Sequence, residues 1–442
     1  MSGLAGVGFF VVSHGCRVNQ YEGDAIASEL LSLGPDEAQR VEDAGVMVLV
    51  SCAVTAEAER KARQEVRRLR RRNPDALLVV CGCWVDRVSD EDLSSMGVDV
   101  GLVNGMKHLV PQLVERHVRG ERLEPVYRER GSSWDSLSLL RPTRHTRAFI
   151  KVQDGCSRGC TYCIIPKLRG PSISRPFGDV LDEARRVLDS GALEVVLTGV
   201  HLGDYNWEGL DLADLVEALG KVAGLKRLRF GSIEPFSVGE RLLRVLGDCG
   251  AFMRHLHIPL QSGDDSVLRR MGRGYRGDDY VALADRARSI LGDDLHLSSD
   301  VMVGFPGEDD EAFEKTLTVL DRASVGRIHP FSYSPRPGTP AFNWERPAPD
   351  VVRARLNRLL ELGASRLESF ASRFVGRRVT VLVERVSEGL ADGLTEGFVR
   401  VRFPYHGPLG VVVELTPTAS MGGTLVVGEG AFVPSDDLLY PL

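Results

Sequence analysis

Three cysteines with close, unequal spacing give the strongest indication of chemistry in the chain. Cys156, Cys160 and Cys163 follow the pattern C-x3-C-x2-C directly after an apolar run. Three thiolates on one tight loop can bind three irons of a cubane cluster, which leaves the fourth iron open to a small molecule. This spacing predicts a catalytic 4Fe–4S cluster. The alternative is a zinc site completed by a histidine such as His145 or His201, although structural zinc sites usually pair two C-x2-C motifs.

A second set of cysteines is dispersed in the sequence. Cys16, Cys52 and Cys83 each stand at the C-terminal end of a predicted strand. In a parallel sheet these ends share one edge, where open α/β folds bind ligands, so the three thiols could hold a second cluster. Equally, they could be small buried residues. Cys81 lies two residues before Cys83, and strand alternation predicts that both face the same side, so Cys81 could replace it as a ligand. Cys249 is expected in the core.

The first third of the chain alternates strand and helix patterns, as a doubly wound parallel sheet requires. Apolar runs cover residues 8–13, 46–51, 76–82 and 98–103, and helical periodicity covers 20–33, 57–72 and 106–118. Residues 119–145 turn polar and irregular, which indicates a linker.

A second alternating block and a β-rich tail follow. Six apolar runs separated by helical stretches predict a partial (β/α)6 barrel, whose chemistry gathers at the carboxyl ends of the strands. These runs are residues 148–152, 193–198, 228–230, 255–258, 296–303 and 327–331. A long helix over 348–374 closes the block. Short strands at 379–384, 396–401, 409–415 and 424–427 then predict a small β-barrel.

Bulk composition narrows the class of protein without identifying it. The chain has 442 residues, 43% hydrophobic and 26% charged, with a net charge of −6. These values are ordinary for a globular protein, and the charge does not by itself indicate a nucleic-acid partner. No apolar run approaches the roughly 18 residues of a spanning helix, and no basic residue precedes the apolar N-terminal stretch, so neither a membrane location nor a signal peptide is expected. The cytosol is the expected compartment, where eight cysteines are better explained as ligands than as disulfides.

With these cysteines the chain resembles the radical S-adenosylmethionine (SAM) methylthiotransferases, over nearly its whole length. The cluster loop GCSRGCTYC is one point of resemblance. The strings around the dispersed cysteines resemble the branch of the family that acts on threonylcarbamoyladenosine in tRNA. They are GCRVNQYE at residues 15–22, SCAVTAEA at 51–58 and GC at 82–83.

Further strings resemble the family on successive strands of the expected barrel. They are LTGVHLGDY at residues 197–205, GSIEP at 231–235, HIPLQSG at 257–263, MGRGY at 271–275, SDVMVGFPGE at 299–308 and FSYSPRPGT at 331–339. By this likeness Gly199, Ser232, Gln261 and Asp300 are candidates for the SAM pocket. Taken singly, each could serve a turn or a helix cap instead.

The resemblance implies three domains: an N-terminal methylthiotransferase domain with the auxiliary cluster (1–140), a radical SAM domain (141–372) and a TRAM-like RNA-binding β-barrel (373–442). It implies two 4Fe–4S clusters and SAM, which is cleaved to a 5′-deoxyadenosyl radical that activates the substrate. The expected reaction adds a methylthio group to the 2-position of N6-threonylcarbamoyladenosine next to the anticodon. The expected partners are tRNA and an electron donor such as flavodoxin or ferredoxin, but neither membrane nor DNA.

Other functions stay open at this point. The substrate could be isopentenyladenosine in tRNA or an aspartate of a ribosomal protein. The chain could also be a non-catalytic iron–sulfur protein that binds RNA or carries electrons, or a zinc-dependent RNA-binding protein.

Two basic patches are candidates for RNA contact, with a solvated helix face as the alternative for the first. The helix over 57–72 carries Arg60, Lys61, Arg63, Arg67, Arg68, Arg70, Arg71 and Arg72. The tail carries Arg373, Arg377, Arg378, Arg385, Arg400 and Arg402, interleaved with Phe398, Phe403 and Tyr405. Aromatic rings in such a patch can stack on unpaired bases.

Overall fold

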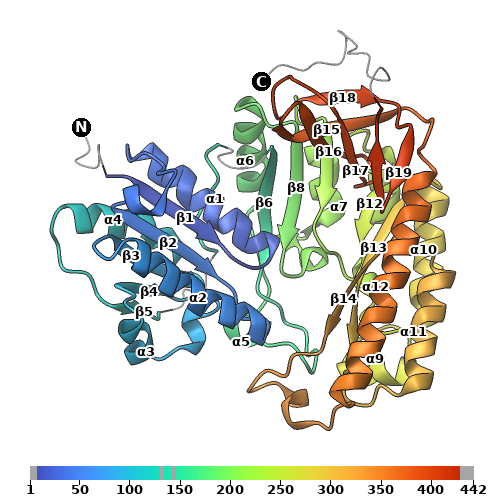
Figure 1. Ribbon diagram of the computed structural model, residues 1–442, viewed down its shortest axis with the longest axis horizontal. Helices are drawn as coiled ribbons and strands as arrows, with labels where there is room; N and C mark the ends of the chain where they lie inside the picture. Colours follow the sequence, from blue (N-terminus) through green and yellow to red (C-terminus); the bar gives the residue numbers. More distant parts are fainter. Residues whose placement is uncertain (1–6, 130–133, 142–145, 429–442) are drawn as a thin grey trace.

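A computed structural model describes residues 7–129, 134–141 and 146–428, and its N-terminal region is built around a five-stranded parallel sheet (Figure 1). The strands, in spatial order, are β1 (Phe9–Ser13), β2 (Val46–Ser51), β3 (Leu77–Gly82), β4 (Val100–Leu102) and β5 (Val126–Tyr127). Every residue of β2 and β3 is buried, as expected when helices cover both faces of a parallel sheet.

Two separate hydrophobic cores flank this sheet. The helices are α1 (Arg17–Ser32), α2 (Ala56–Arg72), α3 (Asp90–Ser95) and α4 (Val110–Val118). Apolar residues of α1 and α4 pack on one face, where Ile26 and Val48 share a core, whereas α2 and α3 pack on the other, where Val66 and Leu49 share a second core. The doubly wound arrangement predicted from the sequence is therefore confirmed.

The path of the chain after α1 creates a reversal of strand order beside β1. Phe9 donates its amide to Asp36 O (3.0 Å) and accepts from Ala38 N (2.7 Å), so a short extended segment lies along the outer edge of β1. The chain then crosses to form β2 on the opposite side of β1. In open α/β sheets such a reversal opens a crevice at the carboxyl ends of the two strands, where ligands bind.

The segment expected to be a linker contributes to this region. β5 adds a fifth strand to the sheet, and Leu137 and Leu139 are fully or almost fully buried in the core. Tyr21 of α1 donates its hydroxyl to Leu137 O (2.9 Å). A two-residue strand has no periodicity to detect, which explains why the sequence did not predict it. Residues 130–133 and 142–145 of the expected linker lie outside the described ranges.

The central region forms an open barrel of six parallel strands. They are β6 (Arg147–Asp154), β8 (Glu194–Gly199), β11 (Arg227–Phe230), β12 (His255–His257), β13 (His296–Val303) and β14 (Arg327–Ser332). The two sheets that contain them are joined where Ser232 bridges His257. The predicted partial (β/α)6 barrel is confirmed.

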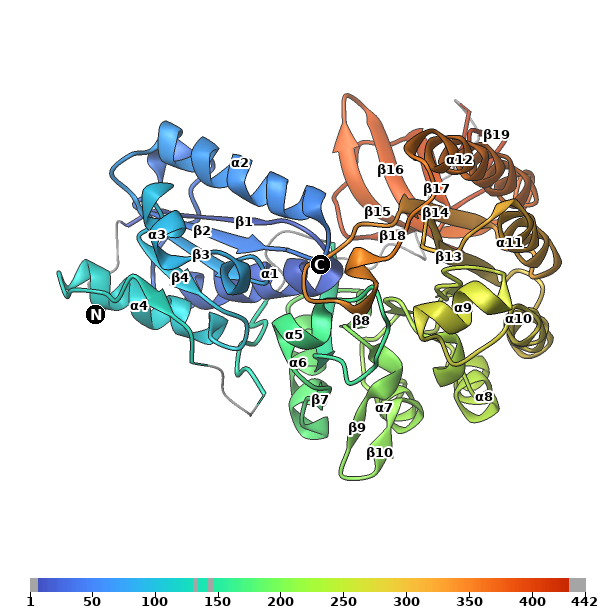
Figure 2. The same cartoon turned by 90° about the horizontal axis from the view of Figure 1, so that it is seen from below.

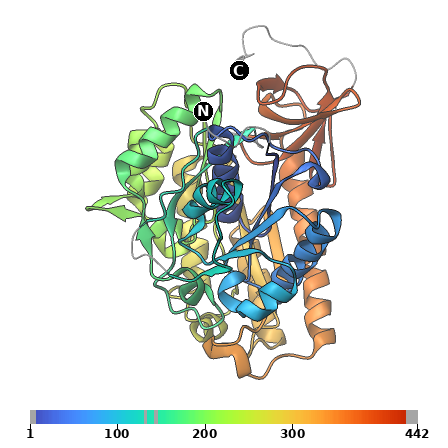
Figure 3. The ribbon, with the colours of Figure 1, turned by 90° about the vertical axis from the view of Figure 1, so that its left-hand side faces the viewer.

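Helices surround this barrel, and the described part of the region has three additional short strands. The helices are α5 (Ile165–Arg169), α6 (Phe177–Asp189), α7 (Leu212–Leu219), α8 (Glu240–Asp248), α9 (Asp265–Met271), α10 (Gly277–Leu291), α11 (Asp310–Arg322) and α12 (Pro349–Ser372). The short strands are β7 (Ile173–Ser174), β9 (Asn206–Trp207) and β10 (Leu210–Asp211). Figure 3 shows α12 running alongside the barrel up to the C-terminal sheet.

The C-terminal region is a curled six-stranded sheet. Its strands are β15 (Val379–Ser387), β16 (Leu390–Thr395), β17 (Arg400–Pro404), β18 (Val412–Leu415), β19 (Ala419–Met421) and β20 (Thr424–Val426). The strand expected over 396–401 is wrong in its bounds, because β16 ends before it and β17 begins at Arg400. Residues between them form a turn in which Phe398 has a φ of 61°.

This sheet is fastened to the barrel by hydrogen bonds from barrel side chains to its backbone. Arg227 donates to Leu394 O (2.9 Å), Arg229 to Thr395 O (2.5 Å), and His296 Nδ1 lies 2.6 Å from Gly397 O. These contacts hold the turn that carries Phe398 against the barrel. Within the described residues, no helix is both long and apolar enough to cross a bilayer.

Candidate functional site

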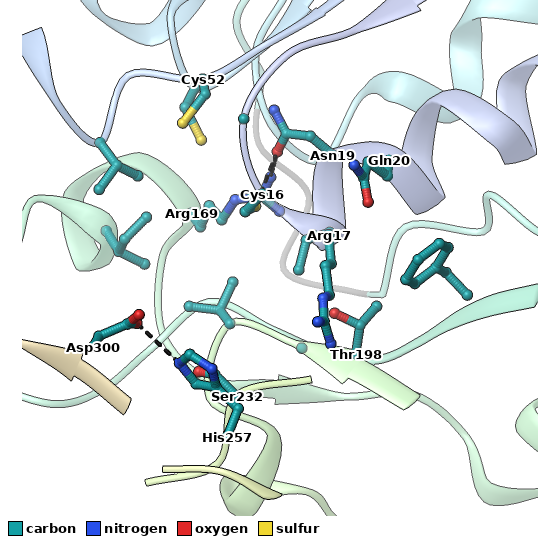
Figure 4. A pocket seen from close by; sticks show the side chains of 18 of the residues that line it. Cys16, Arg17, Asn19, Gln20, Cys52, Arg169, Thr198, Ser232, His257 and Asp300 are labelled. Atoms are coloured by element: carbon teal, nitrogen blue, oxygen red, sulfur yellow. Dashed lines mark hydrogen bonds and ion pairs between the residues drawn. The ribbon is translucent and has the colours of Figure 1, made fainter. Parts of the chain in front are cut away.

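A cavity of about 690 Å³ lies where the three regions meet. That volume is within the range of small-molecule sites. Its walls come from the carboxyl edge of the first sheet, from the barrel strands and from the C-terminal turn; Figure 4 shows the first two of these walls. Polar and aromatic side chains among its lining residues are Cys16, Arg17, Asn19, Gln20, Cys52, Cys83, Arg147, Phe149, Arg169, Thr198, Ser232, His257, Asp300, His329 and Phe398.

The three dispersed cysteines all line this cavity, as the strand-end pattern predicted. Cys16 follows β1, Cys52 follows β2 and Cys83 follows β3, at the edge where the strand order reverses. Their approach depends on Gly15, which has a φ of 111°. A Cβ at this position would lie 2.5 Å from Cys52 Cβ, so only glycine lets the two loops come this close.

The surroundings of these thiols fit a shared cationic ligand. Burial, and after it the nearby thiols of Cys16 and Cys83, raise the pKa of Cys52 to about 12. Cys83 Sγ accepts a hydrogen bond from Asn104 Nδ2 (3.2 Å), and Cys16 Sγ donates to Asn19 Oδ1 (3.5 Å). Three mutually repelling thiolates become favourable when a bound metal centre supplies positive charge, because a coordinated thiol is held deprotonated.

Cys81 does not share this position, and the expectation that it faces the same side as Cys83 is wrong. Cys81 is completely buried in the core on the α1 face, whereas Cys83 belongs to the core on the α2 face. Between them Gly82 has a φ of 102°, which breaks the strand alternation. Cys81 is not among the residues that line the cavity. Cys249 packs, partly buried, against the main core.

The C-x3-C-x2-C loop follows the end of β6. Cys156 N–H donates to Gly170 O (3.0 Å), and Cys163 N–H donates to Cys160 O (3.0 Å), so backbone bonds fix the curvature of the loop. Cys156 Sγ accepts from the backbone amide of Arg158 (3.4 Å). Cys160 Sγ accepts from Arg273 Nη1 (3.5 Å). Donors aimed at sulfur favour thiolates, which is the state that a cluster requires.

A single-ion site does not emerge from the described residues. No three His, Cys, Asp or Glu side chains in the described parts of the chain are placed to hold one metal ion. A cubane spreads its thiolates over different irons, so it does not need such convergence. For the zinc alternative, His145 lies outside the described residues, and His201 is buried with Nδ1 3.3 Å from Asp204 Oδ1.

The residues expected in a SAM pocket divide into two groups. Gly199, Ser232 and Asp300 line the cavity: Gly199 ends β8, Ser232 lies two residues after β11, and Asp300 lies within β13. Gln261 is not among the lining residues, although its backbone N–H donates to Asp300 O (2.9 Å). Its buried side-chain oxygen has no hydrogen-bond partner among the described residues. Burial opposes the charge of Asp300, but a contact of 3.2 Å with His257 Nε2 outweighs it and holds the pKa of Asp300 below its usual value.

A buried charge network joins the first sheet to the barrel beneath the cavity. Glu22 of α1 contacts Lys107 (3.0 Å), Lys151 (3.2 Å) and Arg169 (3.0 Å), and Asp154 contacts Lys151 and Arg169. Three cations thus share two carboxylates. Burial opposes ionisation of Glu22, but the three cations together hold its pKa well below the ordinary value.

Phe398 forms one wall of the cavity beneath a group of cations. Its ring centroid lies 5.6 Å from the guanidinium carbon of Arg17, 5.7 Å from that of Arg147 and 5.2 Å from that of Arg229. His255 stacks on it at 4.7 Å. The non-glycine backbone conformation at Phe398 is costly, and such strain is typical of functional positions.

The basic helix α2 is less cationic than its sequence suggests. Arg60, Arg68, Arg70 and Arg72 each contact a carboxylate at 2.5–2.6 Å, and Lys61 lies 3.8 Å from Glu57. Three exposed arginines remain without a carboxylate contact among the described residues. They are Arg63, Arg67 and Arg71, spaced four residues apart on one face.

The C-terminal patch is also smaller than expected. Phe403 and Tyr405 are buried in the core of the sheet and cannot stack on a base. Four of the arginines contact a carboxylate: Arg373 and Arg377 contact Asp294, Arg378 contacts Glu414 and Arg402 contacts Asp392. Arg385 and Arg400 are exposed and have no such contact within the described chain.

Several side chains around the site were not singled out from the sequence. Arg169 and His329 line the cavity, Asn104 donates to Cys83 Sγ, and Lys107 contacts Glu22 in the buried network. Local patterns do not specify these contacts, because distant parts of the chain form them. Arg169 alone had a usable signal, because it follows the cluster loop by six residues.

Comparison with known families and proteins agrees with this geometry. Residues 150–320 match the radical SAM superfamily, and residues 8–105 match the uncharacterized protein family UPF0004. The chain is 34% identical over 407 residues to the threonylcarbamoyladenosine tRNA methylthiotransferase MtaB of Thermotoga maritima, which covers 89% of this chain and 90% of that protein. The Chlamydia pneumoniae protein of the same name is 36% identical, over 91% of this chain and 93% of the relative.

A relative with another substrate is similarly close. The tRNA-2-methylthio-N(6)-dimethylallyladenosine synthase of Erythrobacter litoralis is 34% identical over 389 residues, with 86% of each chain covered. Among solved structures, the radical SAM methyltransferase TsrM of Kitasatospora setae, with cobalamin and a [4Fe-4S] cluster bound, has a TM-score of 0.55 at 14% identity, covering 88% of this chain and 80% of that one. The structural likeness concerns the fold.

Proposed function

This chain belongs to the radical SAM tRNA methylthiotransferase family, and we propose that it methylthiolates the 2-position of N6-threonylcarbamoyladenosine next to the anticodon of tRNA. One observation carries the proposal. Three cysteines that follow strands of the first sheet line the same cavity as residues of the barrel strands and the turn that carries Phe398. A nucleoside in that cavity would touch all three regions at once.

Enzymes of this family use SAM and 4Fe–4S clusters. We propose that one cluster is held by Cys156, Cys160 and Cys163, and the other by the cysteines that line the cavity, which are Cys16, Cys52 and Cys83. When bound, these groups supply the electron, the radical and the sulfur that the reaction needs. The protein's own residues bind and orient the reactants and exclude water.

The cavity walls suggest how the substrate is oriented. The half-buried ring of Phe398 can stack on the adenine, which is typically worth about 1–3 kcal/mol per base. Ser232 and the Asp300–His257 pair lie on the barrel side and offer polar contacts to SAM or to the ribose. Gln261 fixes the loop beside Asp300 through its backbone.

The RNA around the modified base would contact the arginines that no carboxylate neutralises. Arg63, Arg67 and Arg71 of α2 and Arg385 and Arg400 of the C-terminal sheet flank the cavity entrance in this proposal. Figure 2 shows α2 and the C-terminal sheet on the same side of the molecule. The division into domains at 1–140, 141–372 and 373–442, the cytosolic location and the external electron donor remain predictions.

The threonylcarbamoyl substrate is supported by residues 15–22 and by the named relatives, but a dimethylallyladenosine synthase is equally similar. The deciding experiment compares anticodon stem-loops that carry either modification, using anaerobically reconstituted enzyme and mass analysis of the nucleosides. We expect the methylthio product only from the threonylcarbamoyl substrate. Product only from the isopentenyl stem-loop would assign the chain to the other substrate.

A control in the same experiment ties the product to the cluster loop. Cys156→Ala should abolish formation of both 5′-deoxyadenosine and the methylthio product. If the variant still produced deoxyadenosine, the assignment of this loop would be wrong.

A further inference from the structure

Among the described residues, Arg17 has no carboxylate partner, which distinguishes it from the other arginines of the cavity. Three arginines line the cavity. Arg147 contacts Glu384 (2.7 Å), and Arg169 contacts Glu22 and Asp154. For Arg17, the contacts among the described residues are a hydrogen bond from Nη1 to Phe230 O (3.2 Å) and the ring of Phe398.

The carboxylates near Arg17 are already engaged by other groups. Glu194 contacts both Arg227 (2.7 Å) and Arg229 (2.8 Å). Asp300 contacts His257 (3.2 Å). A guanidinium has five N–H donors in a planar fork, so most of the donors of Arg17 have no protein acceptor in the described structure. The cavity therefore contains a guanidinium most of whose donors are free within the described part of the chain.

The position of Arg17 places this charge beside the proposed reaction centre. It follows Cys16 directly at the start of α1, and its side chain extends toward Thr198 of β8 (Figure 4). Phe398 covers one side of the guanidinium. A base stacked on Phe398 would bring the substituent on its exocyclic nitrogen within reach of the fork.

We propose that the Arg17 guanidinium binds the carboxylate of the threonylcarbamoyl group and so selects this substrate against adenosines with an apolar N6 substituent. This inference rests on the proposed function. The planar fork matches a carboxylate in a bidentate arrangement, which makes such pairs stronger than neutral hydrogen bonds. An isopentenyl group would instead shield Arg17 from water without pairing it, which is costly for a buried charge.

The experiment is a binding cycle with the full-length reconstituted protein. Dissociation constants are measured by fluorescence anisotropy for two stem-loops, one with the threonylcarbamoyl acid and one with its neutral carboxamide. In the unaltered protein we expect the acid to bind about 10- to 100-fold more tightly, as for a hydrogen bond to a charged group. In Arg17→Gln this ratio should fall to about 1. Arg17→Lys should give an intermediate ratio, because it keeps the charge and loses the fork.

Comparing two ligands within one protein keeps the test valid if a variant is partly unfolded, since both affinities then fall alike. Arg244→Gln is the matched control, because it removes an exposed charge from α8 and should leave the ratio unchanged. An unchanged ratio in Arg17→Gln overturns the proposal, as does a change in the KM for SAM alone, which would assign Arg17 to the carboxylate of SAM.

The outcomes also separate this inference from the proposed function. If the unaltered enzyme methylthiolates the threonylcarbamoyl stem-loop and the ratio in Arg17→Gln does not fall, only the role of Arg17 is wrong. If the unaltered enzyme does not modify that stem-loop, both the proposed function and this inference are wrong.

Discussion

Replacing Glu22 by glutamine tests the buried network that joins the first sheet to the barrel. The side chain of Glu22 is completely buried, and its carboxylate contacts Lys107, Lys151 and Arg169 at 3.0–3.2 Å. Glutamine has the same size and removes only the charge. The network would then contain three cations and the single carboxylate of Asp154.

The expected loss of stability follows from this imbalance. Removing one partner of a buried ion pair typically costs about 3–5 kcal/mol, because an uncompensated charge stays buried. Asp154 still neutralises part of the charge, and Lys107 keeps a hydrogen bond to Asn104 Oδ1 (2.6 Å). We therefore expect Glu22→Gln to lower the free energy of unfolding by about 3 kcal/mol.

The assay is urea denaturation followed by tryptophan fluorescence, since Trp84 is fully buried in the first region and reports its unfolding. Glu57→Gln is the control, because Glu57 forms exposed contacts with Arg60 and Lys61 and should change stability by no more than about 0.5 kcal/mol. Adding Lys107→Gln to Glu22→Gln removes one unpaired cation and should recover part of the loss. A Glu22→Gln protein within about 1 kcal/mol of the unaltered one would refute the reasoning.

Three other predictions concern the cysteines, acid stability and RNA. After reconstitution, Cys52→Ser should bind about half as much iron as the unaltered protein and should still form 5′-deoxyadenosine. Cys81→Ala should bind as much iron as the unaltered protein, and equal iron in the two variants would contradict the ligand assignment. Burial lowers the pKa of His296 to about 4. Between pH 6.5 and 4 this imidazole therefore stays neutral in the folded protein and takes up a proton in the unfolded chain, so the free energy of unfolding should fall by up to about 3 kcal/mol as the pH is lowered through this range. Urea denaturation should show a shallower pH dependence in His296→Gln, and an equal slope would argue against this origin. Arg400→Gln should weaken tRNA binding and reduce its salt dependence by about one counterion. Arg402→Gln removes a charge that is paired with Asp392, so it should change the affinity and the salt dependence less. Equal changes in the two variants would contradict the distinction between free and paired arginines.

Local sequence patterns were sufficient for most of the architecture. Strand and helix periodicities are properties of neighbouring residues, so the parallel sheet, the partial barrel and most bounds could be predicted. The position of Cys16, Cys52 and Cys83 after successive strands also implied their meeting, because parallel strands bring their carboxyl ends to one edge. The turn between β16 and β17 was missed because Gly393 and Asp392 make β16 resemble a loop.

The tertiary structure decided which charges and thiols are available for chemistry. The φ of Gly82 sends Cys81 and Cys83 into opposite cores. Arg70 and Arg72 of α2 are paired across the fold with Asp99 and Glu42, in addition to the ion pairs that Glu57 and Glu65 form within the helix. Among the described residues, the fold leaves Arg17 without a carboxylate contact. Sequence determined which groups exist and which element carries each one. Their partners depend on how distant segments pack, because hydrogen bonds and ion pairs act over a few ångströms and join residues that the sequence places far apart.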